Sequence, residues 1–118
     1  MNLAVDRAEM AALVGPNGLL GTGGPVACQV LPPNTPGYAP YCPYTHDGTT
    51  DGGPDMAKAE RLVDASGTRG RRVTVWSSAV FAKAGRYLAS VLADLGYETT
   101  TKVIEDGNEF FGYVSDSF

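Results

Sequence analysis

The fold of this chain is decided by one stretch, RRVTVWSSAVFAKAGRYLASVLADLGYETTTKVIE, which covers residues 71–105. Residues 71–78 and 99–105 are rich in β-branched side chains and predict two strands. Between them, residues 80–95 place apolar side chains at three- and four-residue steps and stop before Gly96, which predicts an amphipathic helix. Its apolar positions are Phe81, Ala84, Leu88, Val91, Leu92 and Leu95. Such a strand–helix–strand unit predicts a parallel strand pair.

Shorter predicted elements precede and follow this unit. Residue patterns predict helices over 2–14 and 55–66, a short strand over 25–31, and a helix or turn over 107–114. The predicted fold class is α/β, with a small, mostly parallel sheet and flanking helices in a three-layer-like arrangement, as a single domain over residues 1–118. Because the helix over 2–14 has no cap before it, we expect the chain to be a piece excised from a longer one.

Length, composition and charge narrow the classes of function. A chain of 118 residues is long enough for one domain, and 43% hydrophobic residues is usual for a globular chain. The net charge of −4 argues against nucleic acid as a partner, since phosphate binding needs clustered Lys and Arg. No apolar run approaches the roughly 20 residues of a membrane-spanning helix. The start, MNLAVDRAEM, lacks the basic region of a signal peptide.

A proline- and tyrosine-rich segment, CQVLPPNTPGYAPYCPYT (residues 28–45), contains the only two cysteines of the chain. Its prolines exclude a helix and a central strand, so it is predicted to be a stiff loop. Cys28 and Cys42 frame this loop and favour a disulfide, which would remove roughly 3 kcal/mol of unfolded-state entropy. Two reduced, partly buried thiols are the alternative, because the sequence does not fix the redox compartment.

No residue set predicts catalysis, a metal or a cofactor. Asp47, Asp51 and Asp55 resemble a calcium-binding loop in spacing, but Lys58 stands where a bidentate Glu is needed. Turn chemistry is therefore favoured, with Asp55 near the start of the helix over 55–66, where a carboxylate interacts favourably with the helix dipole. His46 is the single histidine, and no serine lies in a nucleophile-elbow motif. The chain is therefore expected to be a non-enzyme, with a small hydrolase as the weakest of three functional hypotheses.

Two other motifs favour ordinary structural roles. The glycine-rich GLLGTGG (residues 18–24) follows a helix and precedes a strand, which is the reverse of a phosphate-binding loop. Arg69, Arg71 and Arg72 form a basic group before the strand over 71–78. A solvated turn is the favoured interpretation of this group, because acidic residues dominate elsewhere in the chain.

Several segments together resemble a known family. They are NLAVDRAEMAALVG, CQVLPPNTPGYAPYCPYT, PDMAKAERLVDASG, RRVTVWSS and the helix that ends LADLGYETT. In order and spacing they are similar to one lobe of the peptide/nickel-type (family 5) extracytoplasmic solute-binding proteins of ABC importers. The similarity runs essentially from end to end, and the cysteine-flanked loop is most similar to actinobacterial members.

The resemblance implies a two-lobed α/β clamp that closes on a ligand, of which this chain covers part of one lobe. It implies an extracytoplasmic protein, secreted or membrane-anchored, whose partners are the missing lobe, an ABC permease and a peptide or other small solute. Trp76, Ser77 and Ser78 are the candidate cleft residues, since ligands lie at the carboxyl ends of parallel strands. The family's W-x-x-D segment is not matched here, and no arginine follows the strand, so dipeptide specificity does not carry over.

Two further expectations follow from the resemblance. Some relatives are fused to transcriptional regulators, so a ligand-sensing domain of a regulator is the alternative function. The surface that meets the missing lobe would be exposed, so the isolated chain is expected to form a homodimer with Phe110, Phe111 and Phe118 near the contact.

Overall fold

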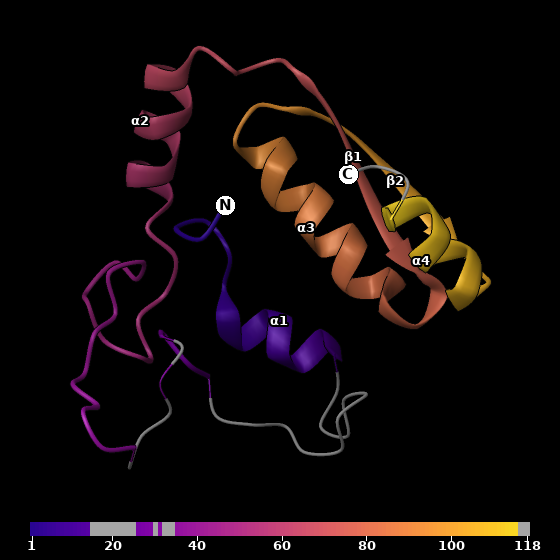
Figure 1. Cartoon of the computed structure of the whole chain (residues 1–118). Coiled ribbons are helices and arrows are strands. Elements are labelled where there is room, and N and C mark those ends of the chain that lie inside the picture. The colour runs from indigo at the N-terminus through magenta and orange to yellow at the C-terminus, as the bar shows by residue number, and fades with distance from the viewer. Residues whose placement is uncertain (15–25, 30, 32–34, 116–118) are drawn as a thin grey trace. The chain divides into compact units, whose positions relative to one another are not determined.

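The computed structural model describes residues 1–14, 26–29, 31 and 35–115. The chain divides into two compact units, Met1–Leu62 and Val63–Phe118, and the boundary falls inside helix α2 (Met56–Ser66). Figure 1 labels the elements of both units. The described residues form four α-helices and one two-stranded parallel sheet, which confirms the coarse α/β class. The single-domain expectation stays a prediction.

The C-terminal unit contains the predicted strand–helix–strand arrangement. Strand β1 (Arg72–Ser78) leads through a short 3-10 turn (Ala79–Phe81) into helix α3 (Ala82–Asp94), then strand β2 (Glu98–Ile104) and helix α4 (Gly107–Ser115). The strands pair in parallel from Arg72 opposite Glu98 to Ser78 opposite Ile104. The predicted parallel pairing is therefore confirmed.

Helix α3 supplies the core of this unit, and Figure 1 shows it lying along the two strands. Its apolar side chains recur on one face because three- and four-residue steps match the helical period. The buried residues of the unit include Val63, Ala84, Gly85, Ala89, Val91, Leu92, Leu95 and Ile104. Leu95 is the most enclosed, with 1% of its surface exposed. Gly96 then takes a φ of +88°, the left-handed conformation that ends a helix without strain only for glycine.

Helix α4 contacts the same two strands as α3 but lies on the opposite face of the sheet. Successive strand side chains point to opposite faces. In β1, Ser77 lies against Gly85 of α3, whereas its neighbour Trp76 lies against Tyr113 of α4. The C-terminal unit is therefore layered as helix, two strands, helix.

In the N-terminal unit, helix α1 covers Arg7–Val14 and is shorter than predicted. Asp6 caps it, since one carboxylate oxygen accepts hydrogen bonds from the backbone N–H groups of Ala8 (2.9 Å) and Glu9 (3.0 Å). The expectation of an uncapped helix that begins at Asn2 was therefore wrong. Residues before Asp6 form a turn whose Leu3 carbonyl accepts a hydrogen bond from Asp55 N–H at 2.8 Å.

The proline-rich loop is closed by a disulfide between Cys28 and Cys42, whose Cα atoms are 4.9 Å apart. The side chain of Gln29 adds a second closure by donating to the Ala39 carbonyl oxygen at 2.8 Å. The disulfide alternative is thus confirmed over the two free thiols. The described residues of 25–31 form no strand, so that prediction was wrong. Prolines that follow directly leave little room for ladder hydrogen bonds there.

Candidate functional site

The three predicted cleft residues fall at the carboxyl end of β1 but do not share one face. Ser77 is 5% exposed and lies on the α3 side of the sheet. A Cβ atom placed on Gly85 would come within 2.7 Å of the Ser77 hydroxyl, so strand and helix are in close contact here. The Ser77 hydroxyl has no hydrogen-bond partner among the described residues. Its environment is that of a packing residue between strand and helix.

Ser78 ends β1 and leads into the 3-10 turn. Its backbone is extended, with φ −73° and ψ 161°, and its hydroxyl makes no capping hydrogen bond. The side chain is half-buried. The next residues return the chain to α3, and Val80 among them is 72% exposed. Ser78 therefore lies where β1 ends and a surface turn begins.

Trp76 is 40% exposed and forms an aromatic cluster with residues from two other elements. Its ring lies 5.4 Å from that of Tyr113 on α4, at an interplanar angle of 56°. The Lys102 ammonium of β2 lies 4.2 Å from the centre of the Trp76 ring and 5.1 Å from that of Tyr113. We call Trp76, Lys102 and Tyr113 the aromatic–lysine cluster.

The parallel register explains why Lys102 meets Trp76. The two residues are direct partners in the strand pair, each at the fifth position of its strand. Sequence reasoning missed Lys102, because the predicted strands over 71–78 and 99–105 do not give the register that pairs Arg72 with Glu98 and so Trp76 with Lys102. Nothing in the sequence pattern indicated Tyr113, because its position depends on how α4 folds back onto the sheet.

The aromatic–lysine cluster has defined chemical properties. A cation over the face of Trp or Tyr is attracted by the ring quadrupole, with about 0.5–1 kcal/mol at exposed sites. The ammonium has three N–H donors, and those directed away from the rings can bind an anionic or carbonyl oxygen. The exposed parts of the rings can stack against a planar or apolar group. The cluster therefore suits a ligand that combines an oxygen acceptor with an apolar part.

A pair of threonines and a pair of charged residues lie on the same face of the sheet, closer to the beginnings of the strands. Thr74 lies opposite Thr100, and Arg72 opposite Glu98. All four side chains are exposed. The Arg72 and Glu98 side chains approach to 3.8 Å, but their exposure leaves this ion pair weak. The face thus runs from a charged pair through hydroxyl groups to the aromatic–lysine cluster.

Two of the three aspartates in the 45–55 segment, Asp47 and Asp55, serve as turn and cap residues. One Asp47 oxygen accepts hydrogen bonds from the Thr49 backbone N–H and hydroxyl, both at 2.9 Å. These bonds, the backbone one first, lower the pKa of Asp47 below its usual 3.8. Asp55 caps α2 by accepting from Lys58 N–H at 3.0 Å. Within residues 1–14, 26–29, 31 and 35–115, no three His, Cys, Asp or Glu side chains gather as a metal site.

The basic group before β1 forms part of a surface turn. The Arg69 side chain pairs with Asp64 at 2.7 Å, and both side chains are largely exposed. Nearby, the hydroxyl groups of Ser66, Thr68 and Tyr97 are joined by contacts of 2.7 Å. This turn connects α2 to the start of the sheet.

Comparisons with protein-family models, curated proteins and solved structures found no match for this chain. The disulfide fits an extracellular, oxidising location. In the part of the chain that the structure describes, none of the helices combines the length and apolar character needed to cross a bilayer.

Proposed function

We propose that this chain is the substrate-binding lobe of an ABC importer's solute-binding protein and takes peptides or similar small solutes together with a second lobe. The observation that carries the proposal is the aromatic–lysine cluster. It lies toward the carboxyl ends of two parallel strands, where open α/β sheets bind ligands. The family resemblance of the sequence supports the same function.

The disulfide favours this function over the alternative, a ligand-sensing domain of a transcriptional regulator. Disulfides persist in extracytoplasmic compartments and are rare in the cytosol, where regulators of transcription act. In this proposal the parent protein is secreted or anchored to the membrane and delivers its solute to an ABC permease. No cofactor and no catalytic residue take part.

An isolated lobe is expected to bind poorly. Well-formed sites enclose roughly 70–90% of a ligand's surface, whereas one lobe of a clamp covers only one side. Ser77 faces α3, so the contacts from this lobe come from Trp76, Lys102 and Tyr113 rather than from three consecutive residues. The exposed ring of Phe111, which also belongs to α4, adds apolar surface to this unit and favours self-association of the lone lobe.

Tryptophan fluorescence tests the proposal directly, because Trp76 is the only tryptophan of the chain. Emission is recorded while di- to pentapeptides are added to this chain and to the full-length parent protein, where the Trp76 signal is the difference between the parent and its Trp76→Phe variant. The parent is expected to respond at micromolar peptide and this chain is not. Micromolar binding by this chain as a monomer contradicts the proposal of a lobe. A parent whose Trp76 emission is unaffected by any solute contradicts the location of the site.

A further inference from the structure

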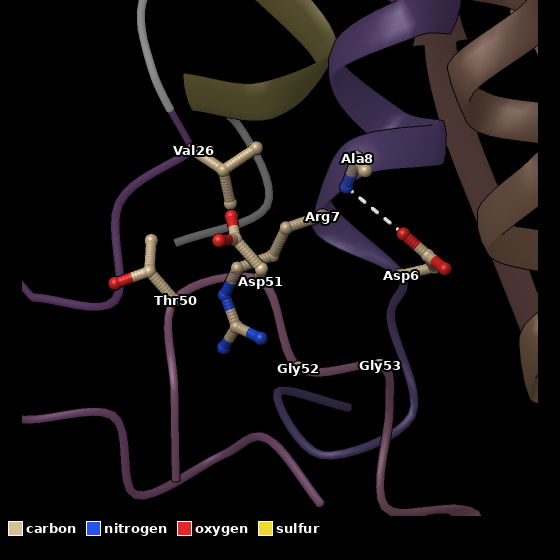
Figure 2. A pocket seen from close by; sticks show the side chains of 8 residues that line it. All are labelled: Asp6, Arg7, Ala8, Val26, Thr50, Asp51, Gly52 and Gly53. Atoms are coloured by element: carbon tan, nitrogen blue, oxygen red, sulfur yellow. Dashed lines mark hydrogen bonds between the residues drawn. The ribbon is translucent and has the colours of Figure 1, made fainter. Parts of the chain in front are cut away.

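A pocket of about 210 Å³ lies in the N-terminal unit and is independent of the aromatic–lysine cluster. It is formed where the first turn of α1 meets the turn over residues 50–53. Figure 2 shows the lining residues, which are Asp6, Arg7, Ala8, Val26, Thr50, Asp51, Gly52 and Gly53. None of them belongs to the site of the proposed function.

Opposite charges line this pocket without neutralising each other. The Arg7 guanidinium donates only to the Asn2 carbonyl oxygen, at 3.3 Å, among the described residues. The Asp51 carboxylate is exposed and pairs with no described residue. In Figure 2 the two charged groups point in different directions from the pocket wall. A ligand with both an anionic and a cationic group can satisfy them together.

The helix terminus itself does not supply the anion site. Asp6 already accepts the N–H groups of Ala8 and Glu9, so these donors of the first turn are occupied. Arg7 is therefore the donor available to a ligand carboxylate.

The wall that carries Asp51 is held in place by hydrogen bonds. His46 N–H donates to the Gly53 carbonyl oxygen at 3.0 Å, and Gly52 N–H donates to that of Thr49 at 3.2 Å. A side chain at Gly52 would collide with the carboxylate of Asp47. The turn therefore presents Asp51 from a fixed backbone.

The size of the pocket selects the ligand class. Sites for drug-sized ligands usually measure roughly 300–1,000 Å³, so a pocket of about 210 Å³ admits a smaller molecule. We propose that this pocket binds a small zwitterion, a free amino acid, with its carboxylate on Arg7 and its ammonium on Asp51. This inference does not depend on the proposed function of the Trp76 site.

Titration of the ¹⁵N-labelled chain with L-alanine, followed by amide chemical shifts, tests the inference. We expect the Gly52 and Gly53 amides to shift, with Kd on the order of 1 mM because both charged groups are solvated. Propionate lacks the ammonium and alaninamide lacks the carboxylate, so each should bind about tenfold more weakly. Equal binding of the three compounds, or no shift at the solubility limit of alanine, overturns the proposal.

Variants that remove one charge test which residue binds the carboxylate of the ligand and which binds its ammonium. Arg7→Gln should weaken alanine binding about tenfold and leave alaninamide binding unchanged. Asp51→Asn should weaken alanine binding and leave propionate binding unchanged. Arg61→Gln and Glu60→Gln on α2 make the same charge changes outside the pocket and should have no effect. Because Asp51 has no described partner, its variant is expected to fold normally. If either pocket variant binds alanine as the unaltered chain does, the assignment fails.

Discussion

The N-terminal unit buries Leu3, Ala4 and Ala59 and closes its long loop with a disulfide, whereas the C-terminal unit buries one whole face of α3 against two strands. Apolar burial contributes about 25 cal/mol per Å², so among the residues that the structure describes the second unit has the larger hydrophobic stabilisation. Small units with little core depend on cross-links instead. The two halves of one chain therefore illustrate two ways to hold a small fold.

Each unit also contains a buried hydroxyl group, and the two groups differ in their hydrogen bonding. In the N-terminal unit, the hydroxyl of Thr45 is buried and lies within hydrogen-bond distance of the Thr49 (2.9 Å) and Cys42 (3.3 Å) carbonyl oxygens. In the C-terminal unit, the buried hydroxyl of Ser77 lacks a described partner. The buried hydroxyl of the first unit is thus held by hydrogen bonds, whereas that of the second lies in a packing contact with Gly85 of α3.

Truncation of Leu95 should have the largest effect. Leu95→Ala removes the most enclosed side chain of the C-terminal core, and such changes cost about 2–5 kcal/mol of unfolding free energy. Urea denaturation followed by Trp76 fluorescence measures the loss. Leu62→Ala, at a site that is 57% exposed, is the control and should change stability by less than about 0.5 kcal/mol. Similar losses in both variants would contradict the idea of a packed core around α3.

Loss of the disulfide should destabilise the N-terminal unit. The Cys28→Ser/Cys42→Ser double variant is expected to lose about 3 kcal/mol, because the unfolded loop regains its freedom. Hydrogen exchange locates the effect: protection of the His46 and Asp55 amides should fall, and that of the Glu98 amide should remain. Alkylation of the unaltered, unreduced chain should label no cysteine. Equal loss of protection at Glu98 would show that the units are not stabilised separately.

The contact between Gly85 and Ser77 should be sensitive to one methyl group. Gly85→Ala places a carbon 2.7 Å from the Ser77 hydroxyl and is expected to cost about 1–3 kcal/mol. Gly112→Ala on α4 meets no atom within 4 Å and serves as the matched control. Ser77→Ala should be neutral or slightly stabilising, since it removes a buried hydroxyl without a described partner. A neutral Gly85→Ala would mean that α3 can move away from β1 freely.

Self-association should depend on the C-terminal unit. Phe111 is 70% exposed beside Phe110, whose ring lies 5.6 Å away, while the third predicted contact residue, Phe118, lies outside the described residues. Phe111→Ser is expected to weaken a homodimer about tenfold, equivalent to about 1.4 kcal/mol. Sedimentation equilibrium measures the dissociation constant of the homodimer. Tyr41→Ser, at an exposed aromatic residue of the N-terminal unit, is the control. A larger effect of Tyr41→Ser would move the contact to the N-terminal unit.

The smallest expected effect is the loss of stability at acid pH that comes from protonation of Asp47. Hydrogen bonds from Thr49 lower the pKa of Asp47 in the folded chain, so its carboxylate adds stability above the unfolded value near 3.8. That contribution is lost as pH falls through the lower folded pKa. The Thr49 amide resonance should report this loss in an NMR titration, and Asp47→Asn should abolish the transition. A transition above pH 3.8 would contradict the direction of the shift.

The sequence predicted the C-terminal unit better than the N-terminal one. Periodic apolar residues define α3, and β-branched runs define β1 and β2, because burial against one partner imposes a regular pattern. The N-terminal unit depends on capping by Asp6 and on turns around Thr45, where single side chains decide the local backbone. These contacts have no period, so helix α1 was predicted too long and residues 25–31 were predicted to be a strand.

The candidate site was predicted only in part. Trp76 was predicted because ligands lie at the carboxyl ends of parallel strands, and its role stays a prediction; Lys102, which was not predicted, is its partner in the register that the structure shows. Ser77 was grouped with Trp76 by adjacency in sequence, but the pleat turns it toward α3. Tyr113 and the pocket beside Arg7 bring together distant segments, which local pattern cannot show.

The disulfide also bears on how these 118 residues, produced by themselves, are oxidised. A chain with only two cysteines has a single possible intramolecular pairing, so no scrambled isomer competes during oxidative maturation. One oxidation step completes the cross-link, and a disulfide isomerase has nothing to correct within one molecule. Production in an oxidising compartment at low chain concentration therefore favours the native pairing over links between molecules.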